Sequence, residues 1–597
     1  MSRIAGIFDI LYDESIKNAL FETMQRPFFD NYDAYELRNG VMLCCSTDKQ
    51  VGYLNWEGER YRIIFDGELY NADELSKDLN LLGHELLNSS DAEIVMHAYA
   101  QWGTEAPERL LGVFTFAVWC EREKKLFLAR DKMGVRPLFY AIHAGGLIFA
   151  SEIKTILSYN TMRAQLDREG IAQVMLIGPG RVPGSGVFKG INELEPGCCA
   201  VYHDKKLITH RYWTLKDREH TESFEKTAEY VRWLVKDSIL RQTQGDETVG
   251  AFLSGGLDSS IISAVYAQKL AECGCKLKTF SVDYVNNDQN FIPGSFQPER
   301  DNSYIELMQS VIQSEHHWTV LSPKDLIECL DIATCARDLP GMGDVDFSLL
   351  VFCDAIKKHV PVALSGECAD EIFGGYPWFA DLEINPQKGF PWSQNIEFRA
   401  SFINDSISID AKEYVFDIYN RAIGQCDILP ENTQHERRIK QMTVLNQYWF
   451  MQTLIDRNDR MSMHSGLNIR APFCDARIAS YMYGVPWEMK RYGDREKGLL
   501  RYAMRDVLPN EILWRKKSPY PKTYDPAYSN LIKKMLGQML EDHSAPIWEL
   551  VERRTARNLT ELDLQCPWYG QLMKGPQTMA YLLQINLWLK KYNIDLV

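Results

Sequence analysis

The chain has 597 residues, enough for two to four domains, and its 45% apolar and 25% charged residues are ordinary for a globular protein. The net charge of −15 argues against non-specific nucleic-acid binding, which requires a basic face. No apolar run approaches 18 residues, so we expect no membrane span. The apolar stretch at the N-terminus is too short for a secretory signal, so we expect a cytoplasmic location. The cysteines are scattered and several lie in apolar runs, which is typical of buried thiols.

The first 210 residues are predicted to be rich in strands. Short runs of β-branched and aromatic residues occur at 62–65, 113–119, 125–129 and 147–150. A helical pattern lies among them, from Asp91 to Tyr99. A polar segment at 215–220 follows, and we interpret it as a linker.

From about residue 222 the pattern changes. Strands predicted at 249–253, 278–283 and 361–364 alternate with helices, which indicates a parallel sheet covered on both faces. After residue 400 the chain is predicted to be mostly helical.

The most informative segment follows the first of these strands and reads Ser254-Gly255-Gly256-Leu257-Asp258-Ser259-Ser260. A glycine turn before a helix aims backbone N–H groups and a positive helix end at one point, and glycines let the main chain approach a ligand closely. We therefore predict a pyrophosphate site, with Asp258 on the accompanying Mg²⁺. The segment lacks the Gly-Lys-Ser/Thr ending of a Walker loop, so γ-phosphate transfer is not expected. The alternative is an ordinary strand-to-helix turn.

A second strand end leads into Ser365-Gly366-Glu367-Cys368-Ala369-Asp370-Glu371-Ile372-Phe373-Gly374-Gly375-Tyr376. Because ligands gather at the carboxyl ends of parallel strands, both segments are expected to face one nucleotide. Crowded carboxylates repel one another unless a cation is present, so Asp258 and Asp370 are predicted to share Mg²⁺. Glu367 would act as a base or orient an incoming amine. The alternative is a helix start whose acidic residues are favoured by the helix dipole.

Later stretches at 459–475 and 497–519 contain several basic residues. An enzyme that splits ATP must neutralise the charge that grows on pyrophosphate, and Lys or Arg can do so. For Lys516 and Lys517 we favour a solvated helix face instead.

In order and approximate spacing, these motifs resemble those of the glutamine-dependent asparagine synthetases over essentially the whole chain. The resemblance rests on 254–260, 365–376, 459–462, 470–475 and 497–501, and towards the N-terminus on 65–71, 112–119 and 128–138. It implies an α/β protein with two domains. Residues 1–212 would form an Ntn-type (αββα) glutaminase-like domain, and residues 222–597 a parallel-sheet ATP-pyrophosphatase (adenine nucleotide α-hydrolase-like) synthetase domain with a helical C-terminal part.

The resemblance implies a carbon–nitrogen ligase that uses ATP and Mg²⁺. Aspartate would be activated as a β-aspartyl-adenylate with release of pyrophosphate, and ammonia would then displace AMP. Glu367 would handle the proton of the attacking amine, Lys497 would stabilise the charge that develops, and Asp258 and Asp370 would hold the metal. The residues at ATP and pyrophosphate would be Leu253, Ser254, Gly255, Gly256, Asp258, Ser259, Ser260, Val282, Ser365, Gly366 and Tyr376.

The N-terminal part departs from the family pattern. The family begins Met-Cys-Gly, and the cysteine becomes the nucleophile once Met is removed, whereas this chain begins Met1-Ser2-Arg3. The family's Arg-Gly-Pro-Asp block is absent near 25–30, and its Arg-Leu-Ser/Ala-Ile block is absent near 41–45. The Asn of the oxyanion element is Asp66, an acceptor where a donor is needed.

We therefore predict a degenerate glutaminase site marked by Ser2, Asp66, Gly67, Glu68 and Asp91. The domain would keep its fold without its activity, and ammonia rather than glutamine would be the nitrogen donor. Ser2 as a replacement nucleophile stays an alternative.

Three interpretations of function remain open. The first is ammonia-dependent asparagine formation, and the second is an amide ligase of the same family that acts on another acid and amine, as in lasso-peptide macrocyclisation or β-lactam closure. The third is a non-catalytic regulatory subunit, against which the retention of Asp258, Glu367, Asp370 and Lys497 argues. The family resemblance also implies a homodimer, and the sequence is silent on whether a separate glutaminase supplies ammonia.

Overall fold

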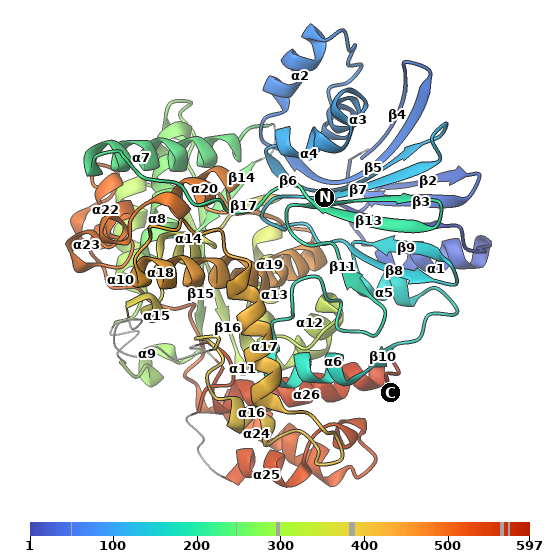
Figure 1. The fold of residues 1–597 in the computed structure, drawn as a ribbon. Helices are drawn as coiled ribbons and strands as arrows, with labels where there is room; N and C mark the ends of the chain where they lie inside the picture. Colours follow the sequence, from blue (N-terminus) through green and yellow to red (C-terminus); the bar gives the residue numbers. More distant parts are fainter. Residues whose placement is uncertain (49, 246–247, 294–298, 381–388, 562–565, 571–572) are drawn as a thin grey trace. The chain divides into compact units, whose positions relative to one another are not determined.

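The computed structural model describes residues 1–597 except 49, 246–247, 294–298, 381–388, 562–565 and 571–572. It divides into two compact units, coloured along the chain in Figure 1. Unit 1 contains Met1–Gly170, Arg181–Thr214 and Ile594–Val597, and unit 2 contains Ile171–Gly180 and Leu215–Asn593. The units are therefore not two consecutive stretches of chain, because residues 171–180 belong to unit 2 and residues 594–597 belong to unit 1.

Unit 1 is built on two antiparallel sheets of six strands each, with strand orders β11-β8-β9-β1-β3-β2 and β13-β12-β7-β6-β5-β4. The first sheet contains β1 (Ser2–Phe8), β2 (Asn31–Leu37), β3 (Gly40–Ser46), β8 (Phe139–His143), β9 (Gly146–Ala150) and β11 (Asn192–Glu193). The second contains β4 (Val51–Trp56), β5 (Glu59–Leu69), β6 (Gly112–Cys120), β7 (Lys125–Arg130), β12 (Cys198–His203) and β13 (Lys206–Arg211). The four predicted strand runs all lie within these strands.

The two sheets pack face to face because each has one apolar face. Ile4 and Met42 of the first sheet share a buried cluster with Ile64 and Trp119 of the second. Helices cover the outer faces: α2 (Ala72–Leu81) and α3 (Asp91–Trp102) lie on the second sheet, and α1 (Glu14–Met24) and α5 (Ile153–Leu157) lie on the first. This order of layers confirms the predicted αββα arrangement.

Unit 2 contains a parallel sheet of five strands in the order β16-β15-β14-β17-β18. The strands are β14 (Val249–Phe252), β15 (Lys278–Tyr284), β16 (Glu315–Leu321), β17 (Val362–Leu364) and β18 (Asn468–Arg470). The first strand lies in the middle, so the strand order reverses between β14 and β17, and a crevice opens at such a point at the carboxyl edge of the sheet. The described chain beyond residue 400 is mostly helical, as predicted.

The segment predicted as a linker, 215–220, has no regular structure but is not a free tether. The carboxylate of Asp217 is fully buried and accepts hydrogen bonds from Leu429 N (3.0 Å), Asn432 Nδ2 (2.7 Å) and Lys440 Nζ (2.5 Å). The segment is therefore fixed onto unit 2 by a satisfied acid, which a polar stretch of sequence did not reveal. No helix in the described part of the chain has the length and apolar character needed to cross a membrane.

Candidate functional site

The glycine turn after β14 is held in one shape by its own residues. Gly255 has φ +65°, and a Cβ there would lie 2.7 Å from Cβ of Tyr304, so the position accepts only glycine without rearrangement. The hydroxyl of Ser259 accepts a hydrogen bond from Ser254 N (3.1 Å) and lies 3.0 Å from Ser254 Oγ. Gly256 caps α8 (Leu257–Ala271), so the free N–H groups of the first helical turn open toward the crevice.

The second turn, after β17, lies against the first. Ser365 N donates to Arg470 O (2.8 Å), which extends the pairing of β17 with β18. A Cβ on Gly366 would lie 3.0 Å from Cβ of Asp258, so the two turns are in contact, as the parallel topology predicts. Cys368 caps the short helix α14 (Ala369–Phe373) with φ +76°, a left-handed conformation that is uncommon for a residue with a side chain.

Two carboxylates and two ammonium groups meet between these turns, and we call Asp258, Asp370, Lys497 and Lys517 the lysine cluster. Lys497 Nζ lies 2.6 Å from Asp258 Oδ2 and 2.8 Å from Asp370 Oδ1, and Lys517 Nζ binds the other oxygen of Asp370. Burial opposes both charges, but the two lysines lower the pKa of Asp370 and the two acids raise the pKa of Lys497. Asp370 and Lys497 are therefore charged at neutral pH, whereas burial raises the pKa of Asp258 against the opposing effect of Lys497.

The prediction for Lys517 was wrong. The residue is not on a helix, its side chain is only 19% exposed, and its ammonium group lies 4.6 Å from the centre of the Tyr376 ring in addition to its contact with Asp370. Irregular backbone after α23 (Asn510–Leu513) carries it into the site. A run of basic residues gives no information about which of them turns inward, so Lys516 and Lys517 could not be separated by sequence.

Arg457 is a site residue that the sequence analysis missed. Its Nη2 lies 2.6 Å from Glu367 Oε1, and the guanidinium group is 3% exposed on α19 (Met451–Ser465). It precedes the 459–462 motif by less than one helical turn, which is the signal that could have found it. A second buried acid, Glu371, accepts a hydrogen bond from Tyr376 Oη (2.6 Å), and burial raises its pKa to about 8.

A further cation closes the site beside the glycine turn. Arg515 donates from Nη1 to Ser254 O (3.3 Å) and forms an ion pair with Asp301, the residue that precedes α10 (Asn302–Ile312). Its guanidinium group lies 4.0 Å from the centre of the Tyr304 ring. The 514–519 stretch therefore contributes three cations to this part of unit 2, Arg515, Lys516 and Lys517.

These groups surround a cavity of about 270 Å³ in unit 2. The predicted site residues that line it are Leu253, Ser254, Gly256, Asp258, Ser259, Val282, Ser365, Gly366, Glu367, Asp370, Tyr376 and Lys497. Gly255 and Ser260 are not among the lining residues: Gly255 faces Tyr304, and Ser260 is fully buried on α8. Arg457, Arg515, Lys516 and Lys517 line the cavity as well.

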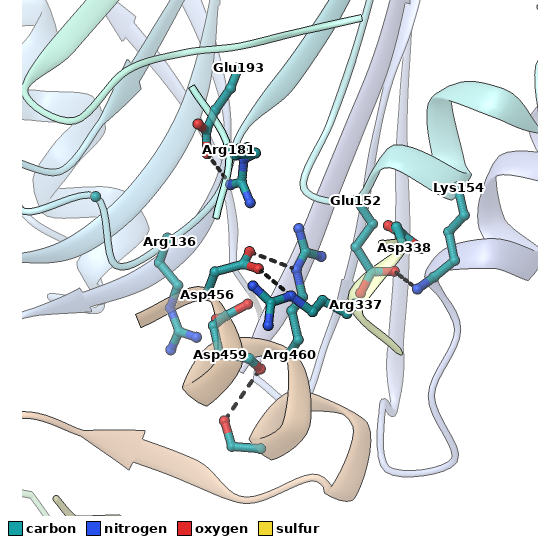
Figure 2. A network of polar contacts seen from close by, with 12 residues as sticks. Arg136, Glu152, Lys154, Arg181, Glu193, Arg337, Asp338, Asp456, Asp459 and Arg460 are labelled. Carbon is teal, nitrogen blue, oxygen red and sulfur yellow. Dashed lines mark hydrogen bonds and ion pairs between the residues drawn. The ribbon is translucent and has the colours of Figure 1, made fainter. Parts of the chain in front are cut away.

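The 459–462 motif itself lies in the interior of unit 2 rather than along the cavity. Figure 2 shows Asp456 between Arg337 and Arg460. The two ion pairs measure 3.3 Å and 3.4 Å, and Ser462 Oγ donates to Asp459 O (3.3 Å) within the same helix. Arg337 also pairs with Asp346 at 3.0 Å. The Arg337–Asp456 pair therefore ties α12 (Leu330–Arg337) to α19, the helix that carries Arg457 to the cavity.

The donor set at the lysine cluster fits a magnesium ion. Mg²⁺ is commonly bound by one or two carboxylates together with substrate phosphates and water. Asp258 and Asp370 already converge on one cation, Lys497 Nζ, and no group of three or more His, Cys, Asp or Glu side chains suited to a metal occurs among the described residues. Two carboxylates with room for ligand oxygens suit a phosphate-linked metal better than a dedicated protein cage.

The predicted degenerate site in unit 1 is filled by charges that bind one another, and we call Ser2, Arg3, Asp66, Ser151 and Glu152 the Asp66 cluster. Ser2 is fully buried and donates from Oγ to Asp66 Oδ1 (3.1 Å). Arg3 Nη1 (3.2 Å) and Ser151 Oγ (3.3 Å) both donate to Asp66 Oδ2. Arg3 also reaches Glu152 through Nε, at 3.3 Å.

Glu152 continues this network at the start of α5. It accepts two hydrogen bonds from Arg26 (2.6 and 2.8 Å) and pairs with Lys154 at 3.2 Å, as Figure 2 shows for the lysine. Among the other predicted residues, Gly67 has φ +156° and a Cβ there would lie 2.1 Å from Val113 O. Asp91 accepts a hydrogen bond from Leu69 N (2.9 Å). Glu68, the residue between Gly67 and Leu69 on β5, is half buried.

Comparisons with known proteins agree with these motifs. A family model for asparagine synthase matches residues 230–590, and one for a glutamine amidotransferase domain matches residues 51–213. The chain is 43% identical over 547 residues to "asparagine synthetase [glutamine-hydrolyzing] 3" of Bacillus subtilis (strain 168), which covers 91% of this chain and 89% of that protein. It is 28% identical over 501 residues to "asparagine synthetase [glutamine-hydrolyzing] 1" of the same organism, covering 78% of this chain and 77% of that protein.

Proposed function

Because this chain belongs to the asparagine synthase family, a family of carbon–nitrogen ligases, we propose that it forms asparagine from aspartate and ATP with free ammonia as the nitrogen donor. The observation that carries the proposal is the lysine cluster, in which two carboxylates and two ammonium groups lie along one cavity at the carboxyl edge of a parallel sheet. A cavity lined by acids and lysines suits a nucleotide whose charge changes during reaction.

The proposed reaction has two steps. An oxygen of the aspartate side-chain carboxylate attacks the α-phosphorus of ATP, the bond to the β-phosphate breaks, and pyrophosphate leaves. The nitrogen of ammonia then attacks the acyl carbon, AMP leaves with the C–O bonding pair, and the surplus proton passes to a base. Ordinary amide formation in water is opposed by the poor leaving group, and adenylation removes that obstacle.

Each charged residue has a proposed role in these steps. The N–H groups of the turn at Ser254–Ser259 would hold the leaving pyrophosphate, and Lys497 and Lys517 would offset the negative charge that grows on it. Asp258 and Asp370 would hold Mg²⁺, which when bound offsets phosphate charge. Glu367, held by Arg457 at 2.6 Å, would accept or direct the proton of the amine.

The proposal includes a silent glutaminase. Both oxygens of Asp66 are already bound, by Ser2, Arg3 and Ser151, and Ser2 is fully buried. A nucleophile must reach its substrate, and an oxyanion needs hydrogen-bond donors beside it, whereas Asp66 accepts hydrogen bonds here. Ser2 therefore lacks both access and a suitable partner.

Two rates test the proposed synthetase activity and the proposed silent glutaminase separately. Pyrophosphate release should depend on ATP, aspartate and ammonium together, and Lys497→Ala should lower its rate by about a hundredfold or more with little change in ATP affinity. Glutamate release from glutamine should stay at the level of a protein-free control, in the wild type and in Ser2→Cys. Pyrophosphate release without aspartate dependence would overturn the acid assignment, and glutamate release abolished by Ser2→Ala would overturn the silent glutaminase.

A different acid substrate is the second candidate, and one observation favours it. Tyr376 and Trp378 stack at 4.4 Å between ring centres, Phe450 packs edge-on against both, and all three line the cavity. An aromatic wall suits an acid with an apolar part larger than that of aspartate. A panel of carboxylic acids in the pyrophosphate assay distinguishes the two, since this candidate requires a faster rate with a larger acid. The homodimer and the cytoplasmic location stay predictions.

A further inference from the structure

Lys517 lies on a segment that no helix or strand supports. Residues 514–517 follow α23 without regular structure, and the backbone N–H of Lys517 donates to a side chain, Glu496 Oε1 (3.3 Å). A lysine ammonium group sits at the end of a flexible four-carbon stem, so its place depends on how firmly the backbone beneath it is held. The contacts that fix this segment therefore decide where the ammonium group of Lys517 lies.

One carboxylate oxygen of Glu496 binds the segment and a buried arginine together. Glu496 Oε1 accepts from Lys517 N and also from Arg501 Nη2 (2.7 Å). Arg501 is fully buried, and it donates from Nε to Glu496 O (2.8 Å) and from Nη1 to Leu513 O (2.5 Å). Glu496 and Arg501 therefore hold residues 513–517 at both ends, and we call this pair of residues the Glu496–Arg501 clamp.

The clamp is continuous with the other lysine of the cluster. Glu496 and Lys497 are successive residues, and Lys497, with φ +55°, immediately precedes α22 (Gly498–Ala503), the helix that carries Arg501. Lys497 Nζ reaches the two carboxylates of the lysine cluster at 2.6 Å and 2.8 Å, whereas Glu496 reaches the backbone of Lys517. One short stretch of chain therefore supplies one lysine of the cluster and supports the other.

The middle of the segment is tied to a different part of the site. Arg515 donates to Ser254 O (3.3 Å) and pairs with Asp301, so it connects the segment to the glycine turn. The clamp acts two residues further along, on the N–H of Lys517 itself. Loss of the clamp would therefore leave Arg515 in place and release the residue whose side chain binds Asp370.

We propose that Glu496 is a positioning residue, which together with Arg501 places the ammonium group of Lys517 against Asp370. The inference rests on the proposed function, in which Lys517 offsets the charge that grows on pyrophosphate. Arg501 lines the cavity, whereas Glu496 is not among the described residues that do, so Glu496 would act through Lys517 rather than on a ligand. A misplacement of about 1 Å at such a group costs on the order of a hundredfold in rate.

Three substitutions of Glu496 separate reach from charge. Glu496→Ala removes the acceptor and should lower kcat for pyrophosphate release by about tenfold, with little change in the KM for ATP. Glu496→Asp keeps the charge but shortens the side chain, and should be slowed similarly. Glu496→Gln loses the charge but keeps an oxygen that can accept both hydrogen bonds, and should stay within about threefold of the wild type.

A double variant tests whether the effect passes through Lys517. In a Lys517→Ala background, Glu496→Ala should lower kcat by less than about threefold further, because the group that it positions is already absent. Losses that multiply fully in the double variant would overturn the inference. Rates of Glu496→Gln as low as those of Glu496→Ala would overturn it as well, since they would assign the effect to charge.

Asp237→Ala is the matched control for a loss of structure alone. Asp237 is a partly buried acid of the same unit that binds two arginines, Arg241 (2.8 Å) and Arg477 (2.6 Å), and it is not among the described residues that line the cavity. Its loss should lower the urea midpoint about as much as Glu496→Ala does and leave kcat unchanged. An equal fall of kcat in both variants would show that Glu496 serves only the fold.

Hydrogen exchange measured by mass spectrometry tests the clamp without any ligase activity. Peptides that contain residues 513–518 should exchange faster in Glu496→Ala and Glu496→Asp than in the wild type, and at the wild-type rate in Glu496→Gln and Asp237→Ala. Unchanged exchange in Glu496→Asp would overturn the inference even where the alanine variant does not fold. A wild type that released no pyrophosphate would contradict the proposed function, while the exchange result still decided whether Glu496 holds this segment.

Discussion

The lysine cluster of unit 2 and the Asp66 cluster of unit 1 are both groups of buried opposite charges, yet they differ in what their charges can still reach. In the lysine cluster the side chains of Asp258, Asp370 and Lys517 keep 16–19% exposure along a cavity. In the Asp66 cluster the side chains of Arg3, Asp66 and Glu152 are at most 2% exposed. Charges that line a cavity can exchange partners with a ligand, whereas charges that enclose one another serve the fold.

The comparison predicts that acids of the lysine cluster matter for rate, and the largest expected effect is on Asp370. Asp370→Asn removes one of the two carboxylates proposed for Mg²⁺ and should lower the rate of pyrophosphate release by roughly a thousandfold. Asp506→Asn is the matched control, because that acid is 63% exposed in the same unit and pairs only at the surface. Similar rates in the two variants would show that the metal site is misplaced.

The second prediction separates two adjacent lysines. Lys517→Ala removes an ammonium group that binds Asp370 and should lower kcat by about a hundredfold with little change in the KM for ATP. Lys516 also lines the cavity, but among the described residues only Lys517 of the two pairs with Asp370, so Lys516→Ala should lower kcat less than Lys517→Ala does. Steady-state kinetics at saturating ammonium measures both, and a reversed order would contradict the cluster as drawn.

The third prediction concerns the closed cluster and is an effect on stability alone. Glu152→Gln removes an acid that Arg3, Arg26 and Lys154 share and should lower the free energy of unfolding by about 3 kcal/mol. Glu14→Gln, which breaks a pair with Lys17 at the surface, should change stability far less. Urea unfolding measures both values. If Glu152→Gln instead changed the ammonia-dependent rate and left stability intact, the enclosed charges would have a catalytic role.

The smallest expected effect is on the pH dependence of stability in unit 1. His97 is buried and its Nδ1 lies 2.9 Å from Nδ1 of His84; burial, followed by the charge of His84, lowers the pKa of His97 to about 4. The unfolded chain therefore binds more protons between about pH 6.5 and 4, and stability falls as pH falls through that window. At pH 5 the loss is about 2 kcal/mol relative to pH 7.5.

His97→Gln isolates this contribution, because the remaining titrating groups are common to both proteins. Urea midpoints at pH 7.5 and pH 5 should fall further in the wild type than in the variant. Equal falls would mean that His97 titrates in the folded protein as it does when unfolded.

Much of the sheet of unit 2 could be predicted because its central strands are short apolar runs between helices. β14, β15 and β17 were predicted within one or two residues, whereas β16 and β18 were not. β16 reads Glu315-His316-His317-Trp318-Thr319-Val320-Leu321 and lies at the sheet edge, where polar residues are tolerated, and β18 has only three residues. Edge strands have a weaker apolar sequence pattern than central strands, since they have a neighbouring strand on one side only and are less fully buried.

The site could be predicted only where one segment of chain carries the chemistry. The two turns at 254–260 and 365–376 hold their acids and glycines in sequence, so their meeting followed from strand order alone. Arg457 and Lys517 reach the cavity from distant segments by the path of the folded backbone. Arg457 is marked only by its place next to the 459–462 motif, and no local pattern marks Lys517. Similarly, the loss of the family's Asn at Asp66 was visible in the sequence, but the enclosure of Asp66 by Arg3 and Ser151 was not.

The most direct test of the account is the origin of the amide nitrogen. The protein is given ATP, Mg²⁺, aspartate, ¹⁵N-ammonium and unlabelled glutamine in equal amounts, and the asparagine formed is analysed by mass spectrometry. An open lysine cluster in unit 2 and a closed Asp66 cluster in unit 1 together predict asparagine whose amide nitrogen is ¹⁵N throughout. Asparagine with a substantial unlabelled fraction would contradict the closed cluster, and the absence of asparagine would contradict the assignment of aspartate as the acid.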